Sequence, residues 1–481
     1  MEKGALKHWW HTGVPQEIQS RKARLHLFGR LVCLGLILVV IFTGLMCLAY
    51  SFPNKTKEPE IVAEMQRIMQ SEDARVTFKE ANRKHDINFQ FDDTSVLEMF
   101  TKDIWIGLTQ KDDGDNILQA AMVPLYSRYW HGIEIALRPA LALVSFSVFQ
   151  TIAGIVFIIL LLWLLAVVWM ELGWRVSLCF SLSFLIVRGY VVPFNLYYSI
   201  DFFIMLIACL VLLYLWNKPR FRRHLPEFFF VIGACMSFFA TLLVPVVSLV
   251  IPLMIGSLLL SKEDKQITFK AVVLYSAAWV LGWAGLWAAK ILLTIPILGI
   301  THFLDHAVQV FFTLGIDSER LLTYATKPAN HTFYSLGLSN ELKNLISLPI
   351  KDAIAGFLFP LLFVVVIVLV FFYSLMVKSK ESPCLLPLLK KDKYWRGIRA
   401  QVKDRFVPNP SVSILYCYIP LLLYMFVMGG HLYVHRNYIL RITMPIYFCL
   451  LYLLTELIPP FWEWLRFQYH MRLAVAQKRH K

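Results

Sequence analysis

The polar and apolar positions of the chain fall into long separate blocks rather than short alternations. Apolar runs of about 20 residues, the length needed to cross a bilayer as a helix, recur between residues 31 and 458. The strands of a membrane barrel would instead alternate in polarity at every second position. The pattern therefore predicts an all-α integral membrane protein.

We expect about ten transmembrane helices. The fifth and sixth form a hairpin of two short helices within 228–260, where Pro245 and Pro252 interrupt the apolar run. The segment 51–149 is polar up to residue 125, and its last part, 133–149, is apolar but broken at Arg138 and Pro139, which indicates an interfacial or re-entrant helix. The other eight spans are expected at 31–50, 150–170, 175–192, 202–216, 271–293, 353–377, 411–428 and 439–458.

Basic residues set the expected orientation. They are concentrated in segment 1–30, in the stretch NKPRFRRHL that begins at Asn217, in the loop 378–410 and in the tail 459–481. Short loops rich in lysine and arginine stay in the cytoplasm. Ten spans with both termini cytoplasmic place all these segments inside, whereas an odd number does not. The large first loop 51–149 and the second polar segment 294–352 then lie outside.

Composition supports this class and excludes others. Hydrophobic residues make up 58% of the 481-residue chain and charged residues only 16%, whereas soluble proteins carry about 25% charged residues. The net charge of +15 comes from the loops beside the spans, so nucleic-acid binding is not expected. The eight cysteines include no CxxC pair, which predicts neither a disulfide framework nor a zinc site.

Ionisable and aromatic residues gather on the predicted outer face. Asp112, Asp113 and Asp115 flank Gly114. The stretch YSRYWHG runs from 126 to 132, and HLYVHRNYILR runs from 431 to 441. A carboxylate can act as a general base, imidazoles can transfer protons and arginines can hold a phosphate. The candidate catalytic residues are Asp115, His431 and His435, and the candidate substrate-binding residues are Asp112, Asp113, Arg128, Tyr129, Trp130, His131, Arg138 and Arg441.

Each feature also has a simpler interpretation. The acidic cluster is also typical of a solvated turn. Tyr129 and Trp130 are also typical of the aromatic belt at a membrane interface. Arg128 and Arg138 are also placed to meet lipid headgroups. No HExxH pattern accompanies the two histidines, so we predict no metal ligands and no cofactor, with a divalent metal left open.

The stretches YSRYWHG and HLYVHRNYILR resemble signatures of a family of large multi-pass envelope proteins of Gram-positive bacteria, as do 193–210, 228–254 and 279–290, in the same order. That family is in turn remotely similar to the C-type glycosyltransferases. These polytopic enzymes use a polyprenyl-phosphate sugar and keep an acidic residue in the first outer loop. The chain departs from the family at 240–245, where it reads ATLLVP and lacks an acidic residue.

The resemblance implies a glycosyltransferase at the outer face of a bacterial cytoplasmic membrane, with an envelope glycan or lipid as acceptor. Asp115 would be the base, Arg128, Arg138 and Arg441 would bind the donor phosphate, and a hydrophobic groove among the spans would hold the lipid tail. A transporter or flippase of a lipid-linked precursor is the alternative, although few ionisable residues fall within the predicted spans. A non-catalytic envelope-assembly protein is a third hypothesis, which the altered 240–245 segment keeps open.

Overall fold

The structure is a computed structural model, and it describes residues 20–51, 116–122, 129–144, 146–240, 244–263, 265–300, 410–428 and 439–455. Within these ranges the regular secondary structure is helical, and no strand is present. The expected all-α class is therefore confirmed. The expected eighth span 353–377, segment 294–352 beyond residue 300, most of loop 378–410 and the tail 459–481 lie outside the described residues.

Four of the described helices contain stretches that are long and apolar enough to cross a membrane. They lie in α2 (Arg21–Ser51), α8 (Phe146–Leu172), α10 (Leu196–Leu215) and α14 (Phe269–Leu298). Large aliphatic side chains on α2 and α8, among them Val40 and Leu162, are exposed on the outside of the bundle. Such surfaces are stable in lipid, which is as apolar as the side chains themselves.

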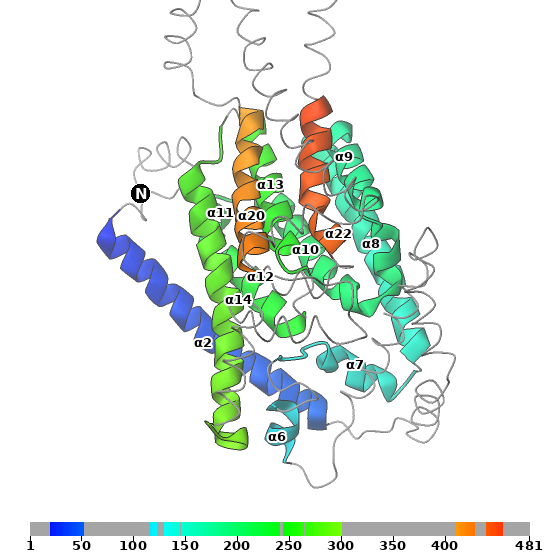
Figure 1. Cartoon of the computed structure of the whole chain (residues 1–481), viewed down its shortest axis with the longest axis vertical. Helices are drawn as coiled ribbons and strands as arrows, with labels where there is room; N and C mark the ends of the chain where they lie inside the picture. The colour runs from blue at the N-terminus through cyan, green and yellow to red at the C-terminus, as the bar shows by residue number, and fades with distance from the viewer. Residues whose placement is uncertain are drawn as a thin grey trace, which may run out of the picture.

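Shorter apolar helices fill the space between these four. They are α9 (Trp174–Ile186), α12 (Leu225–Phe239), α13 (Val247–Lys262), the segment formed by η5 (Pro410–Cys417) and α20 (Tyr418–Val427), and a helix at Met444–Thr455 that follows α22 (Ile439–Ile442). α13 is buried along nearly its whole length, because α10, α12 and η5 pack around it. Figure 1 shows α13 inside the bundle and α2 crossing it obliquely.

Two glycines bring α12 and α14 together. A Cβ at Gly233 would overlap the carbonyl oxygen of Trp279, and a Cβ at Gly282 would overlap that of Phe230. The two backbones therefore touch where neither helix carries a side chain, which is how helices pack closely in membranes. Above and below this crossing, Trp279, Trp283 and Trp287 follow one another at helical spacing, with stacked rings.

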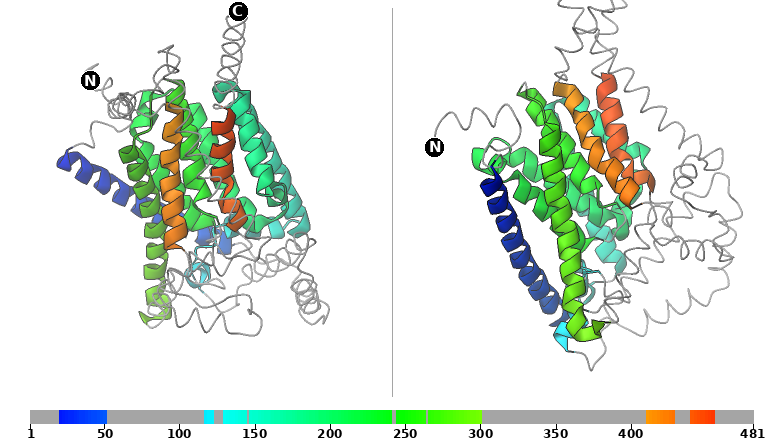
Figure 2. Two further views of the ribbon diagram at one scale, coloured as in Figure 1. Left: turned by 45° about the horizontal axis from the view of Figure 1, so that its top comes forward. Right: turned by 60° about the vertical axis from the view of Figure 1, so that its left-hand side comes forward.

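Short elements close the lower end of the bundle in Figure 1. These are α6 (Ile117–Met122), α7 (Glu134–Leu141) and η2 (Gly189–Phe194). The expected interfacial helix 133–149 is divided: α7 ends at Leu141, and α8 begins at Phe146, four residues before the expected second span. In both views of Figure 2, α6 lies at the same end as the last turns of α14. The opposite end carries α11 (Pro219–Arg223) and the turn between α13 and α14.

Candidate functional site

Buried ionisable side chains gather at the end of the bundle where α6, α7 and η2 lie. A charge in an apolar interior is costly unless it is paired or used, so such residues mark candidate sites in membrane proteins. These side chains come from helices α7, α10, α14 and α22 and from the turn that precedes α7. The residues are His131, Glu134, Arg138, Asp201, Lys290 and Arg441.

Arg138 joins α7 to the end of α2. Its Nε donates to the carbonyl oxygen of Ala49 at 3.2 Å, and its guanidinium carbon lies 4.0 Å above the ring of Tyr50. The last carbonyls of a helix have no partner within the helix and carry its negative dipole end, so a buried cation is favourable there. Because the Arg138 side chain is only 6% exposed, it does not face lipid headgroups. The headgroup interpretation of Arg138 is therefore wrong.

Glu134 lies one helical turn before Arg138 and is completely buried. Neither of its carboxylate oxygens has a hydrogen-bond partner within the part of the chain that the structure describes. Burial raises the pKa of Glu134 to about 8, and the positive charge of Arg138 opposes this rise only in part. At neutral pH Glu134 is therefore protonated in most molecules, and a neutral carboxylic acid can donate a hydrogen bond.

Lys290 holds α6 against α14. Its ammonium donates to the carbonyl oxygen of Met122 at 2.7 Å and lies 5.2 Å from the centre of the Trp130 ring. The Trp130 indole in turn donates to the carbonyl oxygen of Leu286, one turn before Lys290, at 2.8 Å. Trp130 is fully buried, so it is not an aromatic anchor at the membrane interface. The belt interpretation of Trp130 is therefore wrong, because its ring lies over the Lys290 nitrogen inside the bundle.

The turn between Trp130 and α7 is fixed against α12. The backbone N–H of Gly132 donates to the carbonyl oxygen of Phe238 at 2.8 Å, and a Cβ at Gly132 would meet the Phe238 ring at 2.5 Å. His131 has a φ of 54°, a conformation that few residues other than glycine adopt. Its ring packs edge-on against Tyr129. Only a glycine at 132 lets this segment lie directly on α12.

Asp201 and Arg441 belong to a second part of the site, between α10, α20 and α22. Asp201 accepts a hydrogen bond from the Val244 N–H at 3.3 Å through one oxygen, while its other oxygen has no partner among the described residues. Tyr424 of α20 is also buried. The guanidinium carbon of Arg441 lies 3.9 Å above the ring of Tyr198.

Tyr129, Trp130, His131 and Arg138 belong to α7 and the turn before it, at the lower end of the bundle in Figure 1, and Arg441 belongs to α22. The other predicted site residues, Asp112, Asp113, Asp115, Arg128, His431 and His435, lie outside the described residues. Asp115 and Arg128 nevertheless flank α6 in sequence, and His435 precedes α22. Within the described ranges, no three histidine, cysteine or acidic side chains are grouped to hold a metal ion.

Sequence reasoning missed Glu134, Asp201 and Lys290 as site residues. Glu134 and Arg138 are spaced i, i+4, which puts them on one face of a short helix, and this spacing was a usable signal. Asp201 and Lys290 stand near the ends of apolar runs, where a charge normally reaches water. Only the packing of α6 and of the 129–133 turn over Lys290 reveals its burial.

The arrangement offers fixed cations, one carboxylic acid that is neutral near pH 7 and a second buried carboxyl group. Fixed cations in an apolar setting interact strongly with a phosphate, because little water screens the charge. A neutral acid can donate to a phosphate or sugar oxygen without repelling it. In comparisons with known proteins, no family model, curated protein or solved structure matches the chain.

Proposed function

We propose that this protein is a multi-pass enzyme of a bacterial cytoplasmic membrane that transfers a sugar from a polyprenyl-phosphate carrier to an envelope glycan or lipid on the outer face. The observation that supports it most is the burial of Arg138, Lys290 and Arg441 at one end of an apolar helical bundle. Burying three cations is costly, and their use in binding an anionic substrate would explain their presence. The ten spans and cytoplasmic termini expected from the sequence would place this end outside.

The proposed reaction is a displacement at the anomeric carbon of the donor. The acceptor hydroxyl forms the new bond to that carbon while its proton passes to the Asp115 carboxylate. The bond from the anomeric carbon to the phosphate oxygen breaks, and polyprenyl phosphate leaves with the electron pair. Arg138, Lys290 and Arg441 would stabilise the charge that develops on the leaving phosphate, and the Glu134 carboxylic acid would donate to one of its oxygens.

Reconstituted protein tests this proposal directly. Proteoliposomes would be supplied with a panel of radiolabelled polyprenyl-phosphate sugars and with envelope glycan acceptors, and transfer of label would be measured. Asp115→Asn should abolish transfer while membrane insertion stays intact. Asp103→Asn, in the same polar segment, is the matched control and should transfer normally. Normal transfer by Asp115→Asn would exclude Asp115 as the base, and no transfer from any donor would contradict the enzyme assignment.

A second candidate function, export or flipping of a lipid-linked precursor, is favoured by Asp201 and Lys290. Both side chains are buried and both lie in helices long enough to span a membrane, and intramembrane charges commonly mark ion and substrate pathways. Few other ionisable residues fall within the predicted spans, which counts against ion-coupled transport. A flipping assay without acceptor separates the two functions, because a flippase moves a fluorescent lipid-linked sugar between leaflets and an enzyme alone does not.

A further inference from the structure

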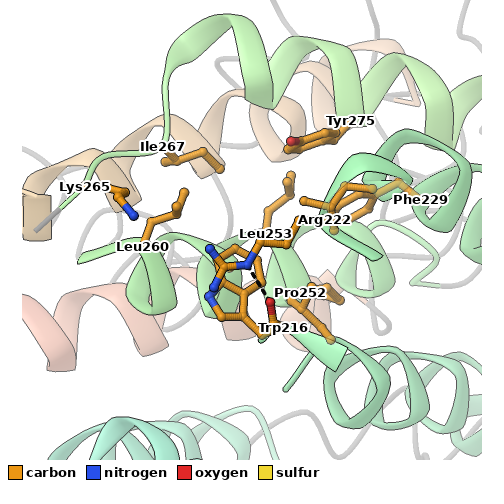
Figure 3. Close-up of a pocket in the computed structure, with 12 residues that line it drawn as sticks. Trp216, Arg222, Phe229, Pro252, Leu253, Leu260, Lys265, Ile267 and Tyr275 are labelled. Carbon is orange, nitrogen blue, oxygen red and sulfur yellow. Dashed lines mark hydrogen bonds between the residues drawn. The ribbon is translucent and has the colours of Figure 1, made fainter. Parts of the chain in front are cut away.

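Two open spaces in the structure differ greatly in size. The slot in Figure 3, which Trp216, Leu253 and Tyr275 help to line, offers about 20 Å³, room for a water molecule but not for a hydrocarbon chain. A groove along α2 offers about 640 Å³, which lies within the range of roughly 300–1,000 Å³ that ligand sites occupy. Of these two spaces, the groove on α2 is the one that can hold a lipid-sized ligand.

The groove follows one face of α2 over about four turns. Residues on this face recur at intervals of three or four positions, the spacing that places side chains above one another on a helix. Among those that line the groove are Lys22, His26, Arg30, Cys33 and Ile37, all of them exposed. Leu27 and Leu31, on the other side of α2, are buried in the core of the bundle. The groove therefore lies on the face of α2 that is turned away from the core.

The polarity of the groove changes along its length. The first ten residues of α2 contain four lysines and arginines, and the sequence has no aspartate or glutamate between residues 18 and 57. One acid reaches this region from another helix, because Glu227 of α12 forms an ion pair with Arg30 at 2.9 Å. Beyond Arg30 the lining is apolar. Gly29, at the boundary, has nothing within 4 Å of an added Cβ, so the helix backbone is accessible there.

A groove that is basic at one end and apolar at the other complements an amphiphile with an anionic head and a hydrocarbon chain. A soluble anion would gain nothing from the apolar part, and a zwitterionic lipid has no net charge to match the basic part. Clusters of four or more basic residues beside the cytoplasmic end of a membrane helix attract anionic lipids. The basic residues of α2 predict that its first turns lie at that side of the membrane.

We propose that this face of α2 binds one anionic phospholipid. The phosphate lies beside Lys22 and His26, and an acyl chain follows the helix past Gly29 along Cys33 and Ile37. This lipid site is independent of the proposed transferase activity, because it uses none of the side chains assigned to the reaction. It would serve to hold the first helix of the chain in a fixed position against the bilayer.

Cys33 provides a local readout of the bound lipid. It is exposed within the groove, whereas Cys47 lies on the same helix outside it. Delipidated full-length protein in detergent would be treated with N-ethylmaleimide at increasing concentrations of phosphatidylglycerol or of phosphatidylcholine with identical acyl chains. Peptide mass spectrometry then gives the rate of modification at each cysteine. Phosphatidylglycerol should halve the rate at Cys33 at a lower concentration than phosphatidylcholine, and the rate at Cys47 should be the same with both lipids.

Two lysine variants separate this site from a general effect of charge. Lys22→Gln should raise the half-protecting concentration of phosphatidylglycerol about fivefold, the contribution of one cation near an anionic headgroup. Lys270→Gln removes an exposed cation near the start of α14, outside the groove, and should leave this concentration unchanged. Glycerol 3-phosphate, a head without a chain, should not protect Cys33.

Four results would overturn the lipid site. They are equal protection of Cys33 by the two lipids, an unchanged half-protecting concentration in Lys22→Gln, the same shift in Lys22→Gln and Lys270→Gln, and a Cys33 that does not react even without lipid. The last result would mean that another segment of the protein covers the groove. Because Lys22 is exposed, its variant should fold normally, and the melting temperature of each variant checks this.

Discussion

Lys290 of α14 and Met122 of α6 are 168 residues apart in sequence, yet the lysine ammonium lies 2.7 Å from the methionine carbonyl oxygen. This bond and the Trp130 ring above the same ammonium fix two segments of the first loop on one membrane helix. A carbonyl and an aromatic face solvate the cation without neutralising it.

Replacing Lys290 by methionine separates the structural role of this cation from its proposed chemical role. Methionine keeps the length and apolar stem of the side chain, and it removes the cost of holding a charge in an apolar interior. We expect Lys290→Met to insert and melt like the wild type but to lose sugar transfer by about 100-fold or more, the cost of removing one stabilising group from an active site. Transfer at the wild-type rate would show that Lys290 serves packing alone.

The stability of the protein should fall as the pH rises through the titration range of Glu134. Burial raises the pKa of this carboxyl group from 4.5 to about 8, so between these values the folded state holds a proton that the unfolded state has lost. The free energy of unfolding should therefore decrease from about pH 4.5 to about pH 8 and then level off. Melting temperatures measured in a single detergent across this range check the direction.

Glu134→Gln removes the titrating group and should flatten this part of the pH profile, with a higher melting temperature than the wild type above pH 8. Glu171→Gln is the control, because Glu171 is partly exposed beside Lys262 at the other end of the bundle. A pH profile that is identical in the wild type and Glu134→Gln would contradict the buried acid.

The α12–α14 crossing should not tolerate side chains at its glycines. Gly233→Leu and Gly282→Leu each force a side chain into the backbone of the facing helix, where no flexible group can move aside. We expect each to destabilise the protein by about 3 kcal/mol or more, the upper range for overpacking. Fluorescence-detected size exclusion after heating measures the loss. Gly44→Leu, on a part of α2 where nothing lies within 4 Å of an added Cβ, should be tolerated.

Removing one member of the Arg222–Glu263 ion pair should destabilise the protein more than replacing both members. Glu263→Gln leaves Arg222 buried beside a neutral amide, and we expect a loss of about 3 kcal/mol, as for other broken buried pairs. The double variant Arg222→Met with Glu263→Gln should recover part of this stability, because the buried guanidinium is removed together with its carboxylate. Thermal unfolding of the two single variants and the double variant measures the coupling, and purely additive losses would contradict it.

Acidification should weaken the same pair. Burial tends to raise the pKa of Glu263, but hydrogen bonds from Arg222, Lys265 and Trp216 outweigh it, and the pKa is lowered overall from 4.5. A lowered acid pKa contributes stability above the unfolded-state value and loses it as the pH falls through the folded-state value. Melting temperatures below pH 5 should therefore fall less steeply in Glu263→Gln than in the wild type, and parallel profiles would count against the pair.

The sequence by itself determined the class of the protein, because the length and apolarity of a run decide whether a helix can lie in a bilayer. The sequence also shows that Trp130, Arg138 and Arg441 stand beside apolar runs, where polar groups are uncommon. It did not reveal which faces pack together. α8 and α13 are apolar on all sides, yet one has exposed aliphatic residues and the other is buried almost completely.

Only the tertiary structure decided which charges are buried. Lipid and protein interior are equally apolar, so hydrophobic periodicity does not distinguish a helix face that meets lipid from one that meets another helix. The partners of Arg138 and Lys290 are backbone carbonyls of Ala49 and Met122, and any residue type offers such a carbonyl. The sequence therefore shows the basic residues but does not indicate which carbonyl groups bind them. The tertiary structure brings each basic side chain to its carbonyl.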